Sequence, residues 1–350
     1  MHKRTFIRWI ALSSIGVAAL TSFVVIVVIL SPLPLEQRKV IFVPEGQTML
    51  QLLDSLGHVD AIRYPLLWKG IAWVGGRFRP VTIYMGSYEL SPELTHGELF
   101  RNLLTGRNRL IRRFTIFEGE TTQHLAGSLA RVLDDDSTRI YRLIVGDSLA
   151  RVFRLEGARS LEGYLLPATY ELYEQEPVEH ALNRMVRHFE TVWNQRFAAR
   201  CLQTGLSRQQ VLALASIIEG EVRNPIEYRR IAGVYWNRLR HNMKLEADPT
   251  VQYALGFPSR RLTFQDYRIE HPYNTYRIAG LPPGPIKAPS VRAIDAVLSP
   301  EEHEYLYFCS SGDSTGTHRF ARTFHEHRTN VRSYYRALQE GATLSNLSQR

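Results

Sequence analysis

The longest apolar run in the sequence lies near the N-terminus. Residues 9–30 form 22 consecutive positions without a charged side chain. As a helix they would span roughly 33 Å, which is about the thickness of the hydrocarbon core of a bilayer. No later run approaches the roughly 18 apolar residues that a second span would need. The pattern therefore predicts one transmembrane helix and a single-pass protein.

The charges around this run are uneven. Residues 1–31 contain no acidic side chain, and three basic residues precede the run: Lys3, Arg4 and Arg8. Because Lys and Arg favour the cytoplasmic side, we expect a cytoplasmic tail at 1–8, a signal anchor in the cytoplasmic (inner) membrane at 9–30, and residues 32–350 in the periplasmic or extracytoplasmic space. A cleaved signal peptide is the alternative, but the run is longer than a usual signal core and no A-x-A site follows it.

A strand, a glycine turn and a helix occur twice after the anchor. A Pro-containing stalk at 31–38 leads to a predicted strand at 40–43, and a capping box, Thr48-x-x-Gln51, opens a helix. The same order recurs 73 residues later, where FTIFEGETTQHLAGSL (114–129) aligns with IFVPEGQTMLQLLDSL (41–56). Two copies are too few for a solenoid, which needs at least three. They indicate two related α/β units.

The segments between the two copies complete a small unit. We predict a helix, a strand and a second helix at 64–74, 81–90 and 95–104. The order strand, helix, helix, strand is typical of small sugar-polymer-binding modules such as LysM, although many small α+β units share it. The predicted fold class is therefore α+β, with the transmembrane helix, a small LysM-like α/β subdomain at 39–110, a larger mixed α+β domain at 111–340 and a tail at 341–350.

Composition and charge exclude several classes of protein. The 350 residues are 44% hydrophobic and 22% charged, which is a globular and not a disordered composition. Two cysteines, Cys201 and Cys309, exclude a disulfide scaffold and a metal site held by four Cys. The net charge of +9 comes from scattered positions without a basic block, so we expect no nucleic-acid partner. A mildly basic surface suits acidic surroundings such as a membrane or a wall polymer.

The most informative segment opens at Ser207-x-x-Gln210, a second capping box. Apolar residues follow at helical spacing: Val211, Leu214, Ala215, Ile218 and Val222. Glu219 falls at the margin of this stripe, whereas Glu221 lies about 200° round the helix from Glu219 and should point elsewhere. Gly220 between them should weaken the helix.

A carboxylate at the margin of an apolar stripe is partly desolvated. Desolvation raises its pKa, which is the tuning that a general acid for glycosidic cleavage needs at neutral pH. Glu219 is therefore the candidate catalytic residue, and an ordinary glutamate at a helix end is the alternative.

The loops that follow carry aromatic and amide side chains beside rigid Pro and Gly. Aromatic faces stack on pyranose rings, and amides and hydroxyls bond to sugar hydroxyls. The candidate sugar contacts are Gln252, Tyr273, Asn274, Thr275, Tyr276 and Asp248. A structural loop is the alternative for the whole set, and a helix cap before Pro249 is the alternative for Asp248.

Several ordered motifs together resemble one family, the YceG-like endolytic murein transglycosylases. They are LEGYLLPATY (161–170), SIIEGE (216–221), NRL (237–239), DPTVQYALG (248–256), PYNTY (272–276), GLPPGPI (280–286) and HRFARTFHEH (318–327). The resemblance covers about residues 40–340, and motifs in a fixed order are far more specific than any one alone. Gly220 departs from the larger polar residue often found at that position in the family.

The resemblance implies a fold, an activity and partners. It places the catalytic glutamate of the family on Glu219 and a LysM-like subdomain before the catalytic domain. It implies internal cleavage of the MurNAc–GlcNAc bond in nascent peptidoglycan strands, with a 1,6-anhydroMurNAc end and termination of strand growth. It also implies that the protein acts beside penicillin-binding synthases and that the reaction requires neither a cofactor nor a metal.

Two other functions remain open from the residues. Glu246 paired with Glu219 would make a two-carboxylate muramidase that hydrolyses its substrate. A membrane-anchored peptidoglycan-binding scaffold without turnover is the second alternative. Glu162, Glu221 and Glu227 are rival carboxylates, with Glu227 at a helix start where the dipole favours its charged form. His318, His325 and His327 lack the spacing of a zinc motif.

Overall fold

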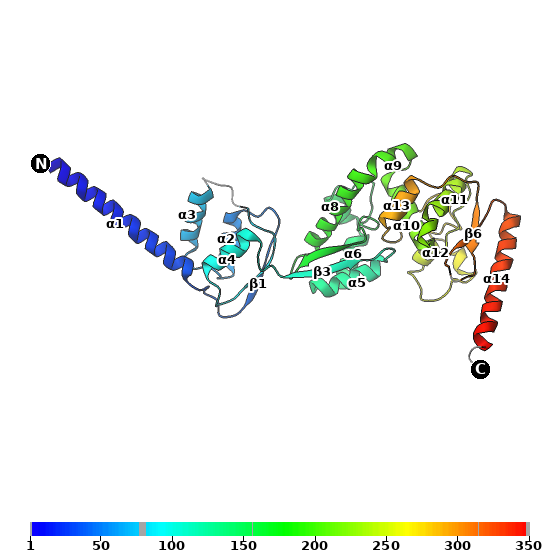
Figure 1. Cartoon of the computed structure of the whole chain (residues 1–350), viewed down its shortest axis with the longest axis horizontal. Coiled ribbons are helices and arrows are strands. Elements are labelled where there is room, and N and C mark those ends of the chain that lie inside the picture. Colours follow the sequence, from blue (N-terminus) through cyan, green and yellow to red (C-terminus); the bar gives the residue numbers. More distant parts are fainter. Residues whose placement is uncertain (1, 77–81, 156, 314, 348–350) are drawn as a thin grey trace. The chain divides into compact units, whose positions relative to one another are not determined.

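The computed structural model describes residues 2–76, 82–155, 157–313 and 315–347. The chain divides into two compact units (Figure 1). Unit 1 comprises residues 1–113, 132–134 and 171–180, and unit 2 comprises residues 114–131, 135–170 and 181–350. We describe each unit by itself.

The first helix, α1, covers His2–Leu30. The predicted span at 9–30 lies partly outside the described side chains, which omit residues 2–14 and 18 within α1. Within the described part of the chain, no helix combines the length and the apolar character needed to cross a membrane.

Unit 1 has the predicted order of strand, helix, helix and strand. Strand β1 (Lys39–Val43) pairs antiparallel with β2 (Gly86–Leu90), and α2 (Met49–His58) and α3 (Pro65–Gly76) lie between them in the chain. Helix α4 (His96–Thr105) follows. Both α2 and α4 begin with a complete capping box, which for α2 is the predicted one at Thr48 and Gln51. The second strand is shorter than predicted, since residues 82–85 are not strand and residue 81 lies outside the described residues.

The predicted stalk is part of the core of unit 1. Leu33 and Leu35 are buried with Leu52, Leu56 and Leu103 in one apolar cluster. The backbone N–H of Leu33 also donates to the Leu94 carbonyl at 2.9 Å. Burial of these two leucines is more favourable than their exposure to water, so part of the segment predicted as a stalk contributes to the core.

The predicted repeat of strand, turn and helix is confirmed. Strand β3 (Ile111–Ile116) and helix α5 (Thr122–Leu133) follow the order of β1 and α2. Gly46 and Gly119 occupy the equivalent turns with φ of 78° and 70°, a left-handed conformation that favours glycine. Strand β3 pairs with β4 (Ala168–Tyr173) in a two-stranded sheet.

Unit 2 is built around a buried helix, α10 (Arg208–Glu221). The helices and two-stranded sheets of the chain together confirm the predicted mixed α+β fold. Helix α10 packs against α11 (Tyr228–Arg240), α12 (Asp248–Ala254) and α13 (Val291–Leu298), as Figure 1 also shows. The antiparallel pair β5 (Tyr307–Ser310) and β6 (His318–Ala321) packs against α14 (Phe324–Leu347). The remaining elements are α6 (Ser137–Val145), α7 (Asp147–Val152), α8 (Val178–Arg196), α9 (Ala198–Thr204), η1 (Pro225–Glu227) and η2 (Asp266–Arg268).

Candidate functional site

The buried helix α10 delivers two carboxylates at its C-terminal turn. Its capping box at Ser207 and Gln210 is the predicted one. Every residue from Val211 to Ile218 is buried, so the helix is apolar all round and not along one stripe. The helix remains regular through Gly220 to Glu221. The side chains at 219 and 221 therefore leave the core on different sides of the same turn.

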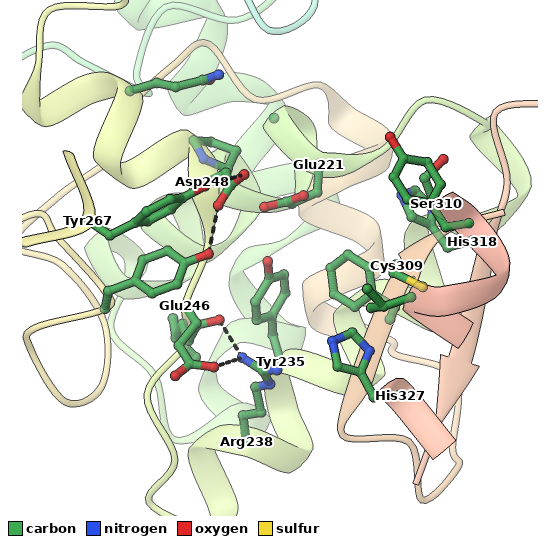
Figure 2. Close-up of a pocket in the computed structure, with 18 of the residues that line it drawn as sticks. Glu221, Tyr235, Arg238, Glu246, Asp248, Tyr267, Cys309, Ser310, His318 and His327 are labelled. Atoms are coloured by element: carbon green, nitrogen blue, oxygen red, sulfur yellow. Dashed lines mark hydrogen bonds and ion pairs between the residues drawn. The ribbon is translucent and has the colours of Figure 1, made fainter. Parts of the chain in front are cut away.

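A cleft of about 950 Å³ opens beside the end of α10. One wall comes from α11, α12 and the loops next to them, and the other comes from β5, β6 and α14 (Figure 2). Its polar lining includes Glu221, Arg223, Tyr235, Arg238, Glu246, Asp248, Gln252, Tyr267, Tyr276, Ser310, His318 and His327. Glu219 is not part of the lining.

Glu221 is a carboxylic acid tuned to neutral pH. Burial raises its pKa to about 7, and the nearby Asp248 carboxylate adds to the rise. Hydrogen bonds from Tyr235 and from the backbone of Asp248 oppose the rise, as does the charge of Lys287. Figure 2 shows Glu221, Asp248 and Tyr235 facing the same space. A partly exposed carboxylic acid with this pKa can both deliver and accept a proton at pH 7.

Asp248 is held in place by two tyrosines. Tyr276 donates to its Oδ1 at 2.6 Å and Tyr267 donates to its Oδ2 at 3.3 Å. Burial, with the Asp248 charge second, raises the pKa of Tyr267 to about 12. Both phenols therefore remain hydrogen-bond donors at neutral pH, and Asp248 keeps a fixed position beside Glu221.

Glu219 has a different role in the packing. The Tyr228 hydroxyl donates to its Oε1 at 2.7 Å, and the Ser290 backbone N–H donates to its Oε2 at 2.9 Å. These bonds join the end of α10 to the start of α11 and to the N-cap of α13. Glu219 is partly exposed, and its two oxygens connect α10 to these neighbouring elements.

Gly220 allows α12 to approach α10 closely. A Cβ atom built at Gly220 would lie 2.7 Å from both Cβ and Cγ of Pro249. The sequence predicted that Gly220 weakens the helix. In the structure, Gly220 instead leaves the space that Pro249 of α12 occupies. The contact brings the first turn of α12, with the Asp248 backbone, to Glu221.

We expect Gly220→Ala to destabilise the protein by about 1–3 kcal/mol, because the methyl group has no space beside Pro249. Urea unfolding measures this loss. The matched control is Gly127→Ala in α5, where a Cβ meets nothing within 4 Å. Alanine there should leave stability unchanged or raise it by up to about 1 kcal/mol. Equal effects of the two substitutions would contradict the close-contact explanation.

The predicted sugar contacts divide into two groups. Gln252, Tyr276 and Asp248 line the cleft. Asn274 and Thr275 are fully buried, so their assignment as sugar contacts does not match the structure. Asn274 donates to the Tyr267 and Ile269 carbonyls, and Thr275 accepts from the Ala247 N–H; these bonds shape the loop behind the wall.

Tyr273 also lies outside the cleft lining. Its ring packs on Tyr253, with 4.5 Å between the ring centroids. The Tyr253 hydroxyl donates to the buried Glu162, whose pKa is raised by burial. Tyr273 and Glu162 thus contact Tyr253 of α12 on the side of that helix that faces away from the cleft.

Glu246 lies on the cleft wall beside an arginine. Arg238 is buried and donates to the Leu306 and Leu245 carbonyls at 2.7 and 2.8 Å. Its guanidinium also contacts a Glu246 oxygen at 3.4 Å (Figure 2). The structure therefore brings Glu246 to the same cleft as Glu221, whereas Glu219 lies outside that lining.

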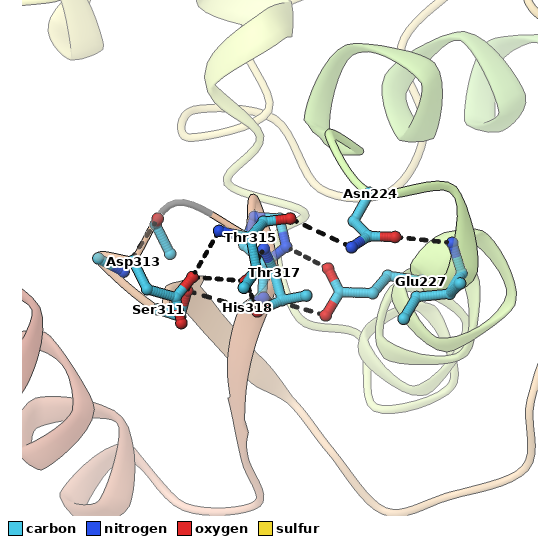
Figure 3. A network of polar contacts seen from close by, with 10 residues as sticks. Asn224, Glu227, Ser311, Asp313, Thr315, Thr317 and His318 are labelled. Carbon is cyan, nitrogen blue, oxygen red and sulfur yellow. Dashed lines mark hydrogen bonds and ion pairs between the residues drawn. The ribbon is translucent and has the colours of Figure 1, made fainter.

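A polar network fastens the second wall (Figure 3). The buried Glu227 of η1 accepts from the His318 backbone N–H at 3.0 Å and contacts His318 Nδ1 at 2.7 Å. Asn224 donates to the Thr315 carbonyl at 3.1 Å, and Asp313 accepts from the Thr315 N–H at 3.0 Å. The network links the chain directly after Glu221 to the β5–β6 turn. It thereby fixes the two walls of the cleft relative to each other.

Two of the three histidines of the HRFARTFHEH segment, His318 and His327, are used in packing. His318 is engaged by Glu227, and the His327 ring stacks on Tyr307 with 5.3 Å between centroids. Among the residues that the structure describes, no group of three or more His, Cys, Asp or Glu side chains is arranged to hold a metal ion.

Sequence reasoning did not select Glu221. The stripe of apolar residues placed Glu219 at its margin and Glu221 elsewhere, but every residue from Val211 to Ile218 is buried, so the helix is covered all round. The available signal was the unbroken apolar run from Val211 to Ile218, which is typical of a helix buried all round. When a helix is buried along its length, its side chains can reach a cleft only where the helix ends, which here is the turn that contains Glu221.

Comparisons with known proteins agree with this architecture. The model of the YceG-like family matches residues 41–333. The endolytic murein transglycosylase of Bacillus subtilis (strain 168) is 28% identical over 318 residues, which cover 85% of either protein. The endolytic murein transglycosylase of Streptococcus pneumoniae serotype 2 (strain D39) is 25% identical over 334 residues, 86% of this chain and 60% of that protein. The crystal structure of a YceG-like protein from Listeria monocytogenes superposes with a TM-score of 0.58 and 26% identity, over 84% of this chain and 99% of that chain.

Proposed function

This chain belongs to the YceG-like family, and from that membership we infer that it is a lytic transglycosylase acting on peptidoglycan. The observation that carries the chemical proposal is Glu221, a carboxylic acid with a pKa of about 7 in the wall of a large cleft. Glycan strands are long, so an endolytic enzyme needs a cleft open at its ends, and this one is bounded by two separate walls.

We propose that Glu221 is the acid and base, and Glu219, to which the family resemblance assigns this role, is the alternative. Protonated Glu221 donates its proton to the oxygen that leaves with GlcNAc, while the bond from that oxygen to MurNAc C1 breaks. The 6-hydroxyl of MurNAc then attacks C1, and its proton passes to the Glu221 carboxylate. The product is a 1,6-anhydroMurNAc end, no water is consumed and Glu221 is again protonated. One carboxylate suffices because the substrate supplies the nucleophile, in contrast to glycosidases that use two.

Asp248 tunes this acid. Its negative charge, fixed by Tyr267 and Tyr276, favours the protonated form of Glu221. We also propose that Gln252 and Tyr276, which line the cleft, contact the glycan.

A two-carboxylate hydrolase is the second candidate, because Glu246 lines the same cleft as Glu221. Product analysis in H₂¹⁸O separates the functions. Mass spectrometry of purified, uncrosslinked strands after digestion should show 1,6-anhydro ends without ¹⁸O. Reducing ends that carry ¹⁸O would establish the hydrolase, and bound but uncut glycan would establish a binding scaffold.

The place of action is a separate part of the proposal. We propose that residues 9–30 anchor the protein in the cytoplasmic membrane, supported by their lack of charge and the basic residues before them. The strand–helix–helix–strand order of β1, α2, α3 and β2 supports a LysM-like, glycan-binding role for this part of unit 1. Action on nascent strands beside penicillin-binding synthases, which would limit strand length, follows from the family resemblance.

The pKa of Glu221 predicts the pH dependence of cleavage. Since the acid form is required, kcat/KM should fall by about tenfold per pH unit as the pH rises above about 7. Asp248→Asn removes a charge that raises this pKa, so the falling limb should move to lower pH and activity at neutral pH should decrease. A pH–rate profile on soluble glycan measures both effects.

Glu246→Gln is the matched control for that profile. It removes a cleft carboxylate that pairs with Arg238 and is not among the groups that shift Glu221. The falling limb should stay in place. If the falling limb of the pH–rate profile moves in Glu246→Gln and stays in place in Asp248→Asn, the role given to Asp248 is contradicted.

A further inference from the structure

Helix α3 exposes large apolar side chains on one side. Trp68 and its neighbours face the core, where the Trp68 ring packs on Phe100 at 4.4 Å between centroids. On the opposite side, Leu66 is 83% exposed and Trp73 is 65% exposed. A Cβ at Gly70 would meet nothing within 4 Å, so the surface between these two side chains is open. An exposed apolar patch of this kind marks a surface that binds something.

The start of α3 and the residue before it lie next to the last turns of α1. Tyr64 and Leu67 share a groove of about 380 Å³ with Phe23, Val24 and Val27. The groove is lined mainly by apolar side chains, and Arg63 stands at it with an exposed side chain. Tyr64 itself is 64% exposed.

The end of α1 is fixed to the same unit. The His96 backbone N–H donates to the Ser31 carbonyl at 3.1 Å, and His96 Nδ1 lies 2.8 Å from that oxygen. A Cβ at Gly97 would lie 2.8 Å from the Ile29 side chain, so α4 and α1 are in close contact. Helix α3 is therefore held beside residues 23–28 and does not swing on a linker.

We propose that α3 is a second membrane contact, lying in the outer surface of the bilayer that α1 enters. The proposal rests on the proposed anchor at 9–30. If those residues span, residues 23–28 lie in the outer half of the apolar layer, and side chains that share their groove lie at its surface. Tyr and Trp favour this interface, and Arg63 can extend its guanidinium to lipid phosphates. Unit 1 would then be held against the membrane with a fixed orientation.

The test uses the full-length protein in nanodiscs of phosphatidylcholine and phosphatidylglycerol. A solvatochromic noncanonical amino acid replaces Leu66 or, in a second variant, Trp73. Both positions are exposed, so the replacements should fold. We expect blue-shifted emission and at least a twofold loss of intensity when doxyl-labelled lipids are included. The same probe at Leu50 of α2, 48% exposed, is the matched control and should not be quenched.

A probe at Leu20 of α1 separates the two proposals. Quenching at Leu20 without quenching at positions 66 and 73 would overturn the α3 contact and leave the anchor standing. Lack of quenching at all of these positions would overturn the anchor itself. A blue shift at position 66 that doxyl lipids do not quench would show that protein, such as a second copy of this chain, covers α3, and would also overturn the proposal.

Discussion

Glu221→Gln is expected to reduce strand cleavage by about 10²–10⁴-fold, because a carboxamide cannot donate the proton that the leaving oxygen needs. The substitution keeps the size of the side chain and a hydrogen-bond acceptor for Tyr235 and for the Asp248 backbone. Binding of glycan and the unfolding midpoint should therefore change little. Release of anhydro-muropeptides, measured by mass spectrometry, and pull-down of insoluble peptidoglycan measure the two properties separately.

Glu219→Gln is the matched control, two residues away on the other side of Gly220. Its amide oxygen can still accept from the Ser290 N–H, and its NH₂ group can donate to the Tyr228 hydroxyl oxygen, so we expect activity within about tenfold of wild type and a modest loss of stability. The opposite result, an inactive Glu219→Gln and an active Glu221→Gln, would return the catalytic role to the residue that the family resemblance favoured. The pair of variants thus decides between two carboxylates on one helical turn.

Glu227→Ala is expected to destabilise unit 2 by about 3 kcal/mol. The side chains of Glu227 and His318 are only 4% and 9% exposed. Removal of the carboxylate leaves the His318 N–H and its imidazole without their acceptor in a buried place. Chemical unfolding followed by circular dichroism measures the loss. Activity should fall as well, because His318 is part of the cleft wall.

The control for Glu227 is Glu301→Ala, in the loop that follows α13. Glu301 contacts Arg230 at 2.9 Å, but their side chains are 39% and 43% exposed. Exposed ion pairs contribute about 0–1 kcal/mol, so this variant should unfold near the wild-type midpoint. If both variants lose the same free energy of unfolding, burial does not explain why Glu227 stabilises the protein.

Much of the fold could be predicted because local signals and tertiary structure agree. The capping boxes at Thr48 and Ser207 begin helices where the sequence places them. The repeated strand, turn and helix depends on Gly46 and Gly119, and both adopt the left-handed conformation that favours glycine. Such features involve only neighbours in sequence.

The candidate site was harder to predict because it depends on distant contacts. The periodicity of α10 selected Glu219, yet the helix is covered on all sides, and only the packing of Pro249 on Gly220 determines what lies beside Glu221. Asn274 and Thr275 have the chemistry of sugar contacts, but their hydrogen bonds to the loop backbone keep them buried. Periodicity describes one helix and says nothing of what covers it.

The two walls of the cleft are far apart in the order of synthesis. Glu221 leaves the ribosome long before β5, β6 and α14, which contribute the opposite wall between residues 307 and 335. A chain interrupted before residue 307 would carry the acid without the surface that faces it. The cleft is thus complete only when nearly all of the chain has been made.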